Sequence, residues 1–127
     1  MTIDEQLLNE VRKKAEESPR LRANFCLHNS QEEKVQKMIN YLLPGTKMPI
    51  HCHNNSEETL IVLKGEITIV YFDSDGTATE IFTLNQSSVP VIDIPKNQWH
   101  NIIVTEPVAL LEIKEGPYRP LGETEML

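Results

Sequence analysis

The N-terminal part of the chain carries apolar side chains at helical spacing. They fall on one face of a helix: Ile3, Leu7, Leu8, Val11 and Ala15. Thr2 to Glu5 has the form of a capping box, and Ser18-Pro19 is a typical stop signal. The pattern predicts a helix over residues 3–17 that packs on the body of the domain or on a second subunit.

The next stretch gives weaker signals. Phe25 to His28 fits a short edge strand, and Ser30 to Glu33 resembles the start of a helix of one or two turns. Residues 30–43 fit either a helix or a strand. We favour a strand over 38–43, because Pro44-Gly45 then supplies a turn that leads into the following strand.

The remainder of the chain alternates short β-branched segments with turn residues. The segments lie near 47–53, 57–64, 66–73, 78–84, 89–94, 99–105 and 108–114. Together with 38–43 they make about eight strands, which is typical of an all-β sandwich or barrel. We expect one domain, in which residues 1–37 form the helix and a lead-in segment and residues 38–127 form the barrel.

Three of the four histidines lie in two short stretches. The run from Gly45 to Gly65 reads G(x)5HxH(x)4E(x)6G, and His100 follows a turn that contains Pro95. On an extended strand His51 and His53 point to the same side, and a short loop lets Glu58 face the same point. His51, His53, Glu58 and His100 therefore predict a site for one divalent transition metal such as Fe, Mn, Ni, Zn or Co.

Alternation also indicates the inner side of the barrel. Glu58, Leu60 and Val62 share one face of their strand, and so do His100, Ile102 and Val104. We expect the metal ligands at the mouth of the barrel, with apolar side chains filling it below.

Charge narrows the range of partners. A net charge of −7 argues against nucleic acid and against an anionic membrane surface. No apolar run reaches the length of a membrane span and no secretory signal is recognised, while two cysteines fit a reducing compartment, so we expect a cytoplasmic protein. A small anionic ligand stays possible, because Arg20 and Arg22 would face one side of an extended segment and could clamp a phosphate or carboxylate.

The run from Gly45 to Gly65 resembles the first cupin motif at every defining position. The second cupin motif is matched at Pro95 and His100, whereas Asn97 stands where Gly is usual; Asn tolerates the left-handed turn conformation. This resemblance implies a cupin double-stranded β-helix, or jelly-roll barrel, with a bound metal.

Further segments resemble the WbuC family of cupin-fold metalloproteins. They are Ser18 to Asn24 with Leu27-His28, Pro44 to Thr46, Pro49 to His53, Ile94-Pro95 with Trp99-His100, and Gly116 to Tyr118. Members of that family are found among bacterial surface-polysaccharide genes. The resemblance draws attention to Arg20, Arg22 and His28 as substrate-binding candidates, but it does not imply a particular substrate.

Three functions fit these residues. The first is a metal-dependent enzyme, such as an isomerase, epimerase or dioxygenase, acting on a small molecule such as a sugar or sugar nucleotide. The second is a metal-free sugar isomerase or epimerase with histidine acid–base catalysis, and the third is a non-catalytic, metal-anchored sensor or binding module. Tyr41 and Tyr71 are the candidate additional acid–base groups. Strands with two apolar faces favour a homodimer.

Overall fold

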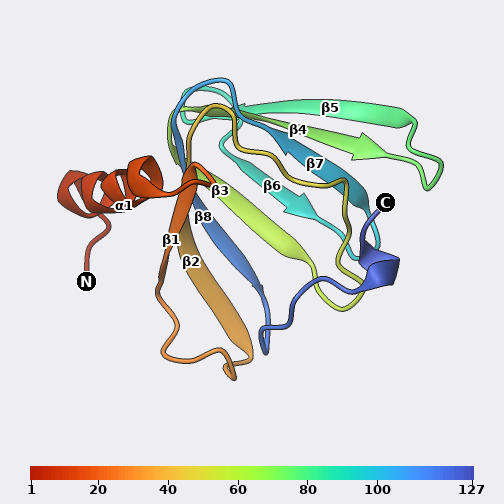
Figure 1. The fold of residues 1–127 in the computed structure, drawn as a ribbon, viewed down its shortest axis with the longest axis horizontal. Helices are drawn as coiled ribbons and strands as arrows, with labels where there is room; N and C mark the ends of the chain where they lie inside the picture. Colours follow the sequence, from red (N-terminus) through yellow and green to blue (C-terminus); the bar gives the residue numbers. More distant parts are fainter.

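Two antiparallel β-sheets and one N-terminal helix make up the computed structural model, which describes residues 1–127 (Figure 1). The elements are α1 (Glu5–Glu17), β1 (Arg22–Cys26), β2 (Val35–Leu42), β3 (Glu58–Lys64), β4 (Glu66–Phe72), β5 (Ala78–Asn85), β6 (Val91–Ile94), β7 (Trp99–Ile103), β8 (Val108–Glu115) and the 3-10 helix η1 (Glu123–Glu125). The five-stranded sheet has the order β1-β2-β8-β3-β6, and the three-stranded sheet has the order β5-β4-β7. The predicted all-β jelly roll of eight strands with an N-terminal helix is confirmed.

Helix α1 packs on the outer face of the five-stranded sheet. Its buried side chains Leu8, Val11 and Ala15 form a cluster with Ile39, Tyr41 and Ala109 of β2 and β8. The helix is capped by Asp4, whose carboxylate accepts a hydrogen bond from the Leu7 backbone N–H at 3.0 Å. In this structure α1 therefore packs on the body of the domain, whereas the predicted capping box starting at Thr2 is wrong by two residues.

The stretch between α1 and β3 differs most from expectation. Residues 30–33 form turns rather than a helix, and β2 runs from Val35, so the favoured strand exists and begins earlier than predicted. β1 also begins earlier, at Arg22, directly after Leu21 with a left-handed φ of 58°.

Residues 47–53 do not form the predicted strand. His51 makes isolated antiparallel bridges to His100 and Met126, and the rest of the segment is irregular. Pro49 has no N–H to donate to a sheet ladder, which explains why regular pairing does not extend through it.

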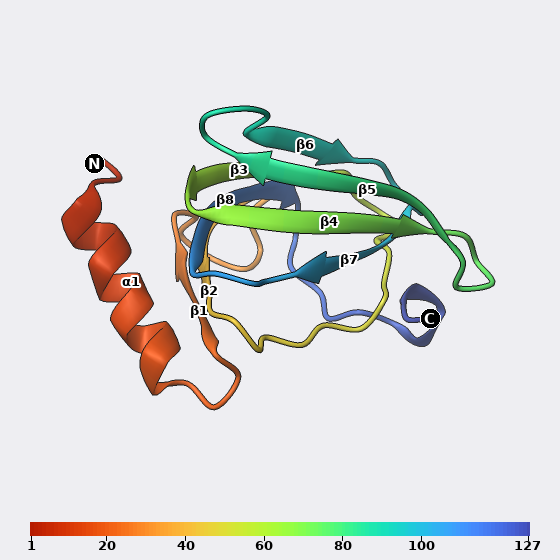
Figure 2. The same ribbon diagram turned by 90° about the horizontal axis from the view of Figure 1, so that it is seen from above.

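The core lies between the two sheets, which face one another in Figure 2. Glu58, Leu60 and Val62 are buried on β3, and His100, Ile102 and Val104 are buried on and just after β7, as the alternation predicted. Figures 1 and 2 place α1 and the C-terminal segment at opposite ends of the barrel. Neither helix has the length and hydropathy that crossing a membrane requires.

The glycine that ends the first motif has a steric role. Gly65 joins β3 to β4 with φ +84°, and a Cβ there would collide with the carbonyl oxygen of Pro107. The position therefore requires glycine for both its backbone conformation and its close packing.

Candidate functional site

Three histidines from two separate parts of the chain meet inside one end of the barrel. The His51 backbone N–H donates to the His100 carbonyl at 3.0 Å, and the His100 N–H donates to the His51 carbonyl at 2.8 Å. This pairing places the two rings side by side, with centroids 4.3 Å apart, and the His53 ring lies 5.3 Å from His51 and 5.9 Å from His100. One nitrogen from each ring lies within 4.8 Å of the others, so the three side chains could hold a metal ion.

Backbone carbonyls orient two of the rings. His51 Nδ1 lies 2.9 Å from the Pro49 carbonyl oxygen, and His100 Nδ1 lies 2.9 Å from that of Gln98. A carbonyl only accepts hydrogen bonds, so each Nδ1 carries the proton and each Nε2 presents a lone pair. His100 is fully buried, and its Nε2 has no hydrogen-bond partner. A buried, unpaired nitrogen beside two further imidazoles fits a metal ligand, because coordination would satisfy it.

Glu58 joins this cluster through His53. Its Oε2 lies 2.8 Å from His53 Nε2, and the residue is only 4% exposed. Two neighbouring ligands bound at about 2.1 Å to one metal stand about 3 Å apart, so this pair fits adjacent coordination positions. Burial opposes the charged form of Glu58, but the hydrogen bond from His53 and the nearby imidazoles outweigh it and hold the pKa below its usual value.

His51 and His100 are neutral near pH 7. Burial, with His100 as the next cause, lowers the pKa of His51 to about 4, and burial likewise lowers the pKa of His100. Neutral imidazoles and an ionised carboxylate are the protonation states that bind metal.

The loop after β6 also supports the histidines. Asn97 adopts a left-handed φ of 66°, which Asn tolerates in place of the usual glycine of the motif. Its backbone N–H donates to the His53 carbonyl at 2.9 Å. The departure from the second cupin motif therefore preserves the turn.

The wall beside the cluster is more polar than predicted. Val108, Leu110, Glu112 and Lys114 alternate on the inner face of β8, and the last two replace the expected apolar filling. Glu112 accepts a hydrogen bond from the Asn40 amide at 3.2 Å and lies 3.4 Å from Lys114 Nζ. Burial, followed by the Glu58 charge, raises the pKa of Glu112 to about 7. The same period of two, had it been applied to residues 108–114, would have placed Leu110 and Glu112 on one face of the strand.

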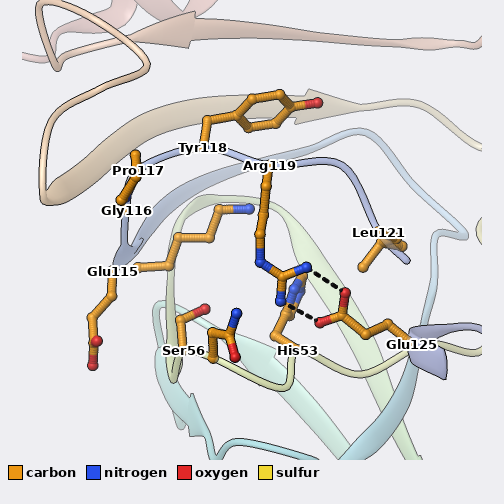
Figure 3. A pocket seen from close by; sticks show the side chains of 11 residues that line it. His53, Ser56, Glu115, Gly116, Pro117, Tyr118, Arg119, Leu121 and Glu125 are labelled. Carbon is orange, nitrogen blue, oxygen red and sulfur yellow. Dashed lines mark hydrogen bonds and ion pairs between the residues drawn. The ribbon is translucent and has the colours of Figure 1, made fainter. Parts of the chain in front are cut away.

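The C-terminal segment closes a second side of the site. Arg119 pairs with both oxygens of Glu125 at 2.8 and 2.9 Å, and the two side chains face each other in a cavity that His53 also lines (Figure 3). Glu125 is 1% exposed and also accepts a hydrogen bond from the Asn54 N–H at 2.7 Å. These contacts, with the Leu127 N–H bonded to the Ile50 carbonyl, fix the irregular segment that bears His51 and His53. The sequence did not predict Arg119 and Glu125 as site residues, because no local pattern indicates that Glu125 contacts Asn54, 71 residues away.

The remaining candidates occupy four different environments. Arg20 and Arg22 line one cavity despite the left-handed Leu21 between them, which replaces the extended segment that was predicted. Tyr71 is buried between the sheets and pairs in register with His100, with burial raising its pKa. Tyr41 lies under α1 on the outer face, with Arg12 5.9 Å from its ring centroid, and His28 bonds to the Lys37 backbone. The structure does not bring Tyr41 or His28 to the histidine cluster.

Solved structures with similar folds include several cupins. A conserved protein of unknown function from Streptococcus pyogenes is 14% identical, with a TM-score of 0.61 and 80% of each chain covered. A cupin superfamily protein from Desulfitobacterium hafniense DCB-2 is 20% identical, with a TM-score of 0.58, and the match covers 74% of this chain and 76% of that one. The capsular polysaccharide assembling protein CapF from Staphylococcus aureus is 20% identical at a TM-score of 0.60, but the match covers 77% of this chain and only 27% of CapF. These similarities show the cupin fold.

Sequence comparison adds a family but no described activity. No curated protein matches the chain. One family model, described as a domain of unknown function (DUF6016), matches residues 3–84, a range that contains His51, His53 and Glu58 and stops before His100. The match spans more than half of the residues of this chain, and the chain therefore belongs to the DUF6016 family.

Proposed function

We propose that this protein is a metal-dependent cupin enzyme that acts on a small molecule. The observation that carries the proposal is the buried His100 Nε2, which has no hydrogen-bond partner and lies among His51 and His53. His51, His53, Glu58 and His100 would hold the metal. A bound divalent metal would supply Lewis-acid chemistry by polarising a carbonyl or hydroxyl oxygen, or redox chemistry if it were iron.

Glu112 favours an enzyme over a sensor. An isomerisation or epimerisation needs a group that accepts and returns a proton near neutral pH. Glu112 lines the cavity that contains His51, His53 and Glu58, and its burial raises the pKa to about 7 in the metal-free protein, toward the range that such a group needs. Asn40 and Lys114 contact its two oxygens and hold the carboxyl in place.

The resemblance to WbuC-family proteins supports a sugar or sugar nucleotide of surface-polysaccharide metabolism as the substrate. The polar side chains Asn40, Glu112 and Lys114 along the inner wall are compatible with a hydroxylated molecule of this kind. We include this substrate class in the proposal.

The test is metal content, measured by mass spectrometry on protein purified without added metal. We expect near-stoichiometric metal in the wild type and its loss in a His51→Ala/His100→Ala double variant. His28→Ala is the matched control, because it removes the one histidine outside the cluster. Wild-type protein that contains no metal and takes up none on reconstitution would refute the proposal.

A further inference from the structure

The cavity at the histidine cluster continues along the barrel wall. A hollow of about 240 Å³ contains His51, His53 and Glu58, and a neighbouring hollow of about 310 Å³ contains Arg20 and Asn40. The two share five lining residues: Arg22, Met48, Ile102, Glu112 and Tyr118. Shared walls of this extent make them two ends of one binding space.

Two guanidinium groups give this space unpaired positive charge: Arg20 at the end away from the histidines, and Arg22 where the two hollows meet. Neither Arg20 nor Arg22 makes an ion pair or a side-chain hydrogen bond within the protein, although the chain has 19 acidic residues. By contrast, Lys114 and Arg119 near the cluster are paired with Glu112 and Glu125. A guanidinium that lines a cavity without a carboxylate partner suits the anionic group of a ligand.

The walls between the two ends have different characters. On the five-stranded sheet Asn24 pairs in register with Asn40, whose amide donates to Glu112, so polar groups lead from β1 toward the cluster. The remaining wall is apolar and includes Leu60, Ile102 and Leu110. A hydroxylated carbon skeleton fits such a space, because its hydroxyls meet amide and carboxylate groups while its C–H surface packs on the apolar side.

From these features we infer that the space binds a small hydroxylated anion, of the sugar phosphate or sugar acid class. Arg22, with Arg20 as a second donor, binds the anionic group, Asn40 and Glu112 bind hydroxyls, and one oxygen of the ligand reaches the histidine cluster. This inference names the substrate class of the proposed enzyme and therefore rests on that proposed function, but the guanidinium end binds its anion independently of the metal.

The experiment is calorimetric titration with four probes: glucose 1-phosphate, gluconate, neutral glucose and inorganic phosphate. We expect one of the two hydroxylated anions to bind at least about 10-fold more tightly than glucose and than inorganic phosphate. Glucose 1-phosphate and gluconate separate a phosphate-binding site from a carboxylate-binding one. Arg22→Gln should weaken that binding about 10-fold or more, and Arg22→Lys by a smaller factor, because it keeps the charge and loses the planar fork.

Arg12→Gln is the matched control. It removes the same charge, but Arg12 lies on α1 over Tyr41, on the outer face of the sheet. We expect unchanged binding, and thermal melting of each variant checks that it is folded. Equal affinities of wild type and folded Arg22→Gln, or no binding of any probe, would overturn the inference.

Metal content measured on the same samples separates this inference from the proposed function. Arg22-dependent anion binding by protein that holds no metal and takes up none on reconstitution would support the inference while refuting the metal-dependent enzyme. If the protein contains metal and Arg22→Gln binds the anion as tightly as wild type does, the metal site is supported and the guanidinium site is refuted.

Discussion

Replacing Glu112 by Gln tests the electrostatics of the inner wall. In the metal-free protein, burial and the Glu58 charge raise the pKa of Glu112 from 4.5 to about 7. The folded protein therefore holds this proton more tightly than the unfolded chain does. The stabilisation that comes from this tighter proton binding is fully present below pH 4.5 and is lost as the pH rises through about 7.

The magnitude follows from the size of this difference. A shift of this extent corresponds to about 3 kcal/mol, an upper value because the Glu112 side chain retains 14% exposure. Glutamine cannot ionise and keeps an oxygen for the Asn40 amide, but its own amide would face Lys114. The loss of the contact with Lys114 is the same at every pH. Any change with pH in the difference between the two free energies of unfolding therefore comes from the ionisation of Glu112.

Urea unfolding of metal-free wild type and Glu112→Gln at about pH 4 and pH 8 measures this quantity. We expect the free energy of unfolding of the variant, relative to wild type, to be greater at the higher pH by about 2–3 kcal/mol. Glu115→Gln, an exposed position on the same strand, is the control. If the two proteins differ by the same amount at both pH values, Glu112 ionises normally and the reasoning about its burial is wrong.

Three further predictions concern the cluster, its support and assembly. Because the pKa of His51 is lowered to about 4, equilibrium dialysis should show metal retained from neutral pH down to about pH 5; loss near pH 6.5 would indicate ordinary imidazoles. Glu125→Gln should weaken metal affinity about 10-fold by loosening the segment that bears His53, measured by competition with a chelator, whereas Glu123→Gln should not; equal effects would argue against a specific role for Glu125. Light scattering should show a homodimer that Val91→Lys converts to monomers, since Val91 is 44% exposed on the part of the outer face of the five-stranded sheet that α1 leaves uncovered; a monomeric wild type would refute this.

Alternation allowed the strands and their inner faces to be predicted. Glu58, Leu60 and Val62 occupy a strand with one fully buried face, where a polar residue among apolar ones still follows the period of two. The spacing of His51, His53 and Glu58 indicated metal chemistry before any geometry was available.

The parts that could not be predicted depend on long-range contacts or unusual backbone conformations. His51 lies in an irregular segment whose shape is set by His100 and Met126, far away in sequence. Leu21 adopts a left-handed conformation, which is rare for a leucine and cannot be predicted from its side chain. The contact between Asn54 and Glu125 spans 71 residues, and no local periodicity carries that information.

The position of β8 within the five-stranded sheet has a consequence for folding. β8 pairs with β2 on one side and β3 on the other, so the β1–β2 pair is joined to β3 within this sheet only through β8. The region that the family model matches, residues 3–84, therefore cannot complete this sheet alone. We expect folding to be a single cooperative transition that waits for residues 108–115, and to be slow, on the order of milliseconds to seconds, as in other proteins dominated by non-local strand pairing.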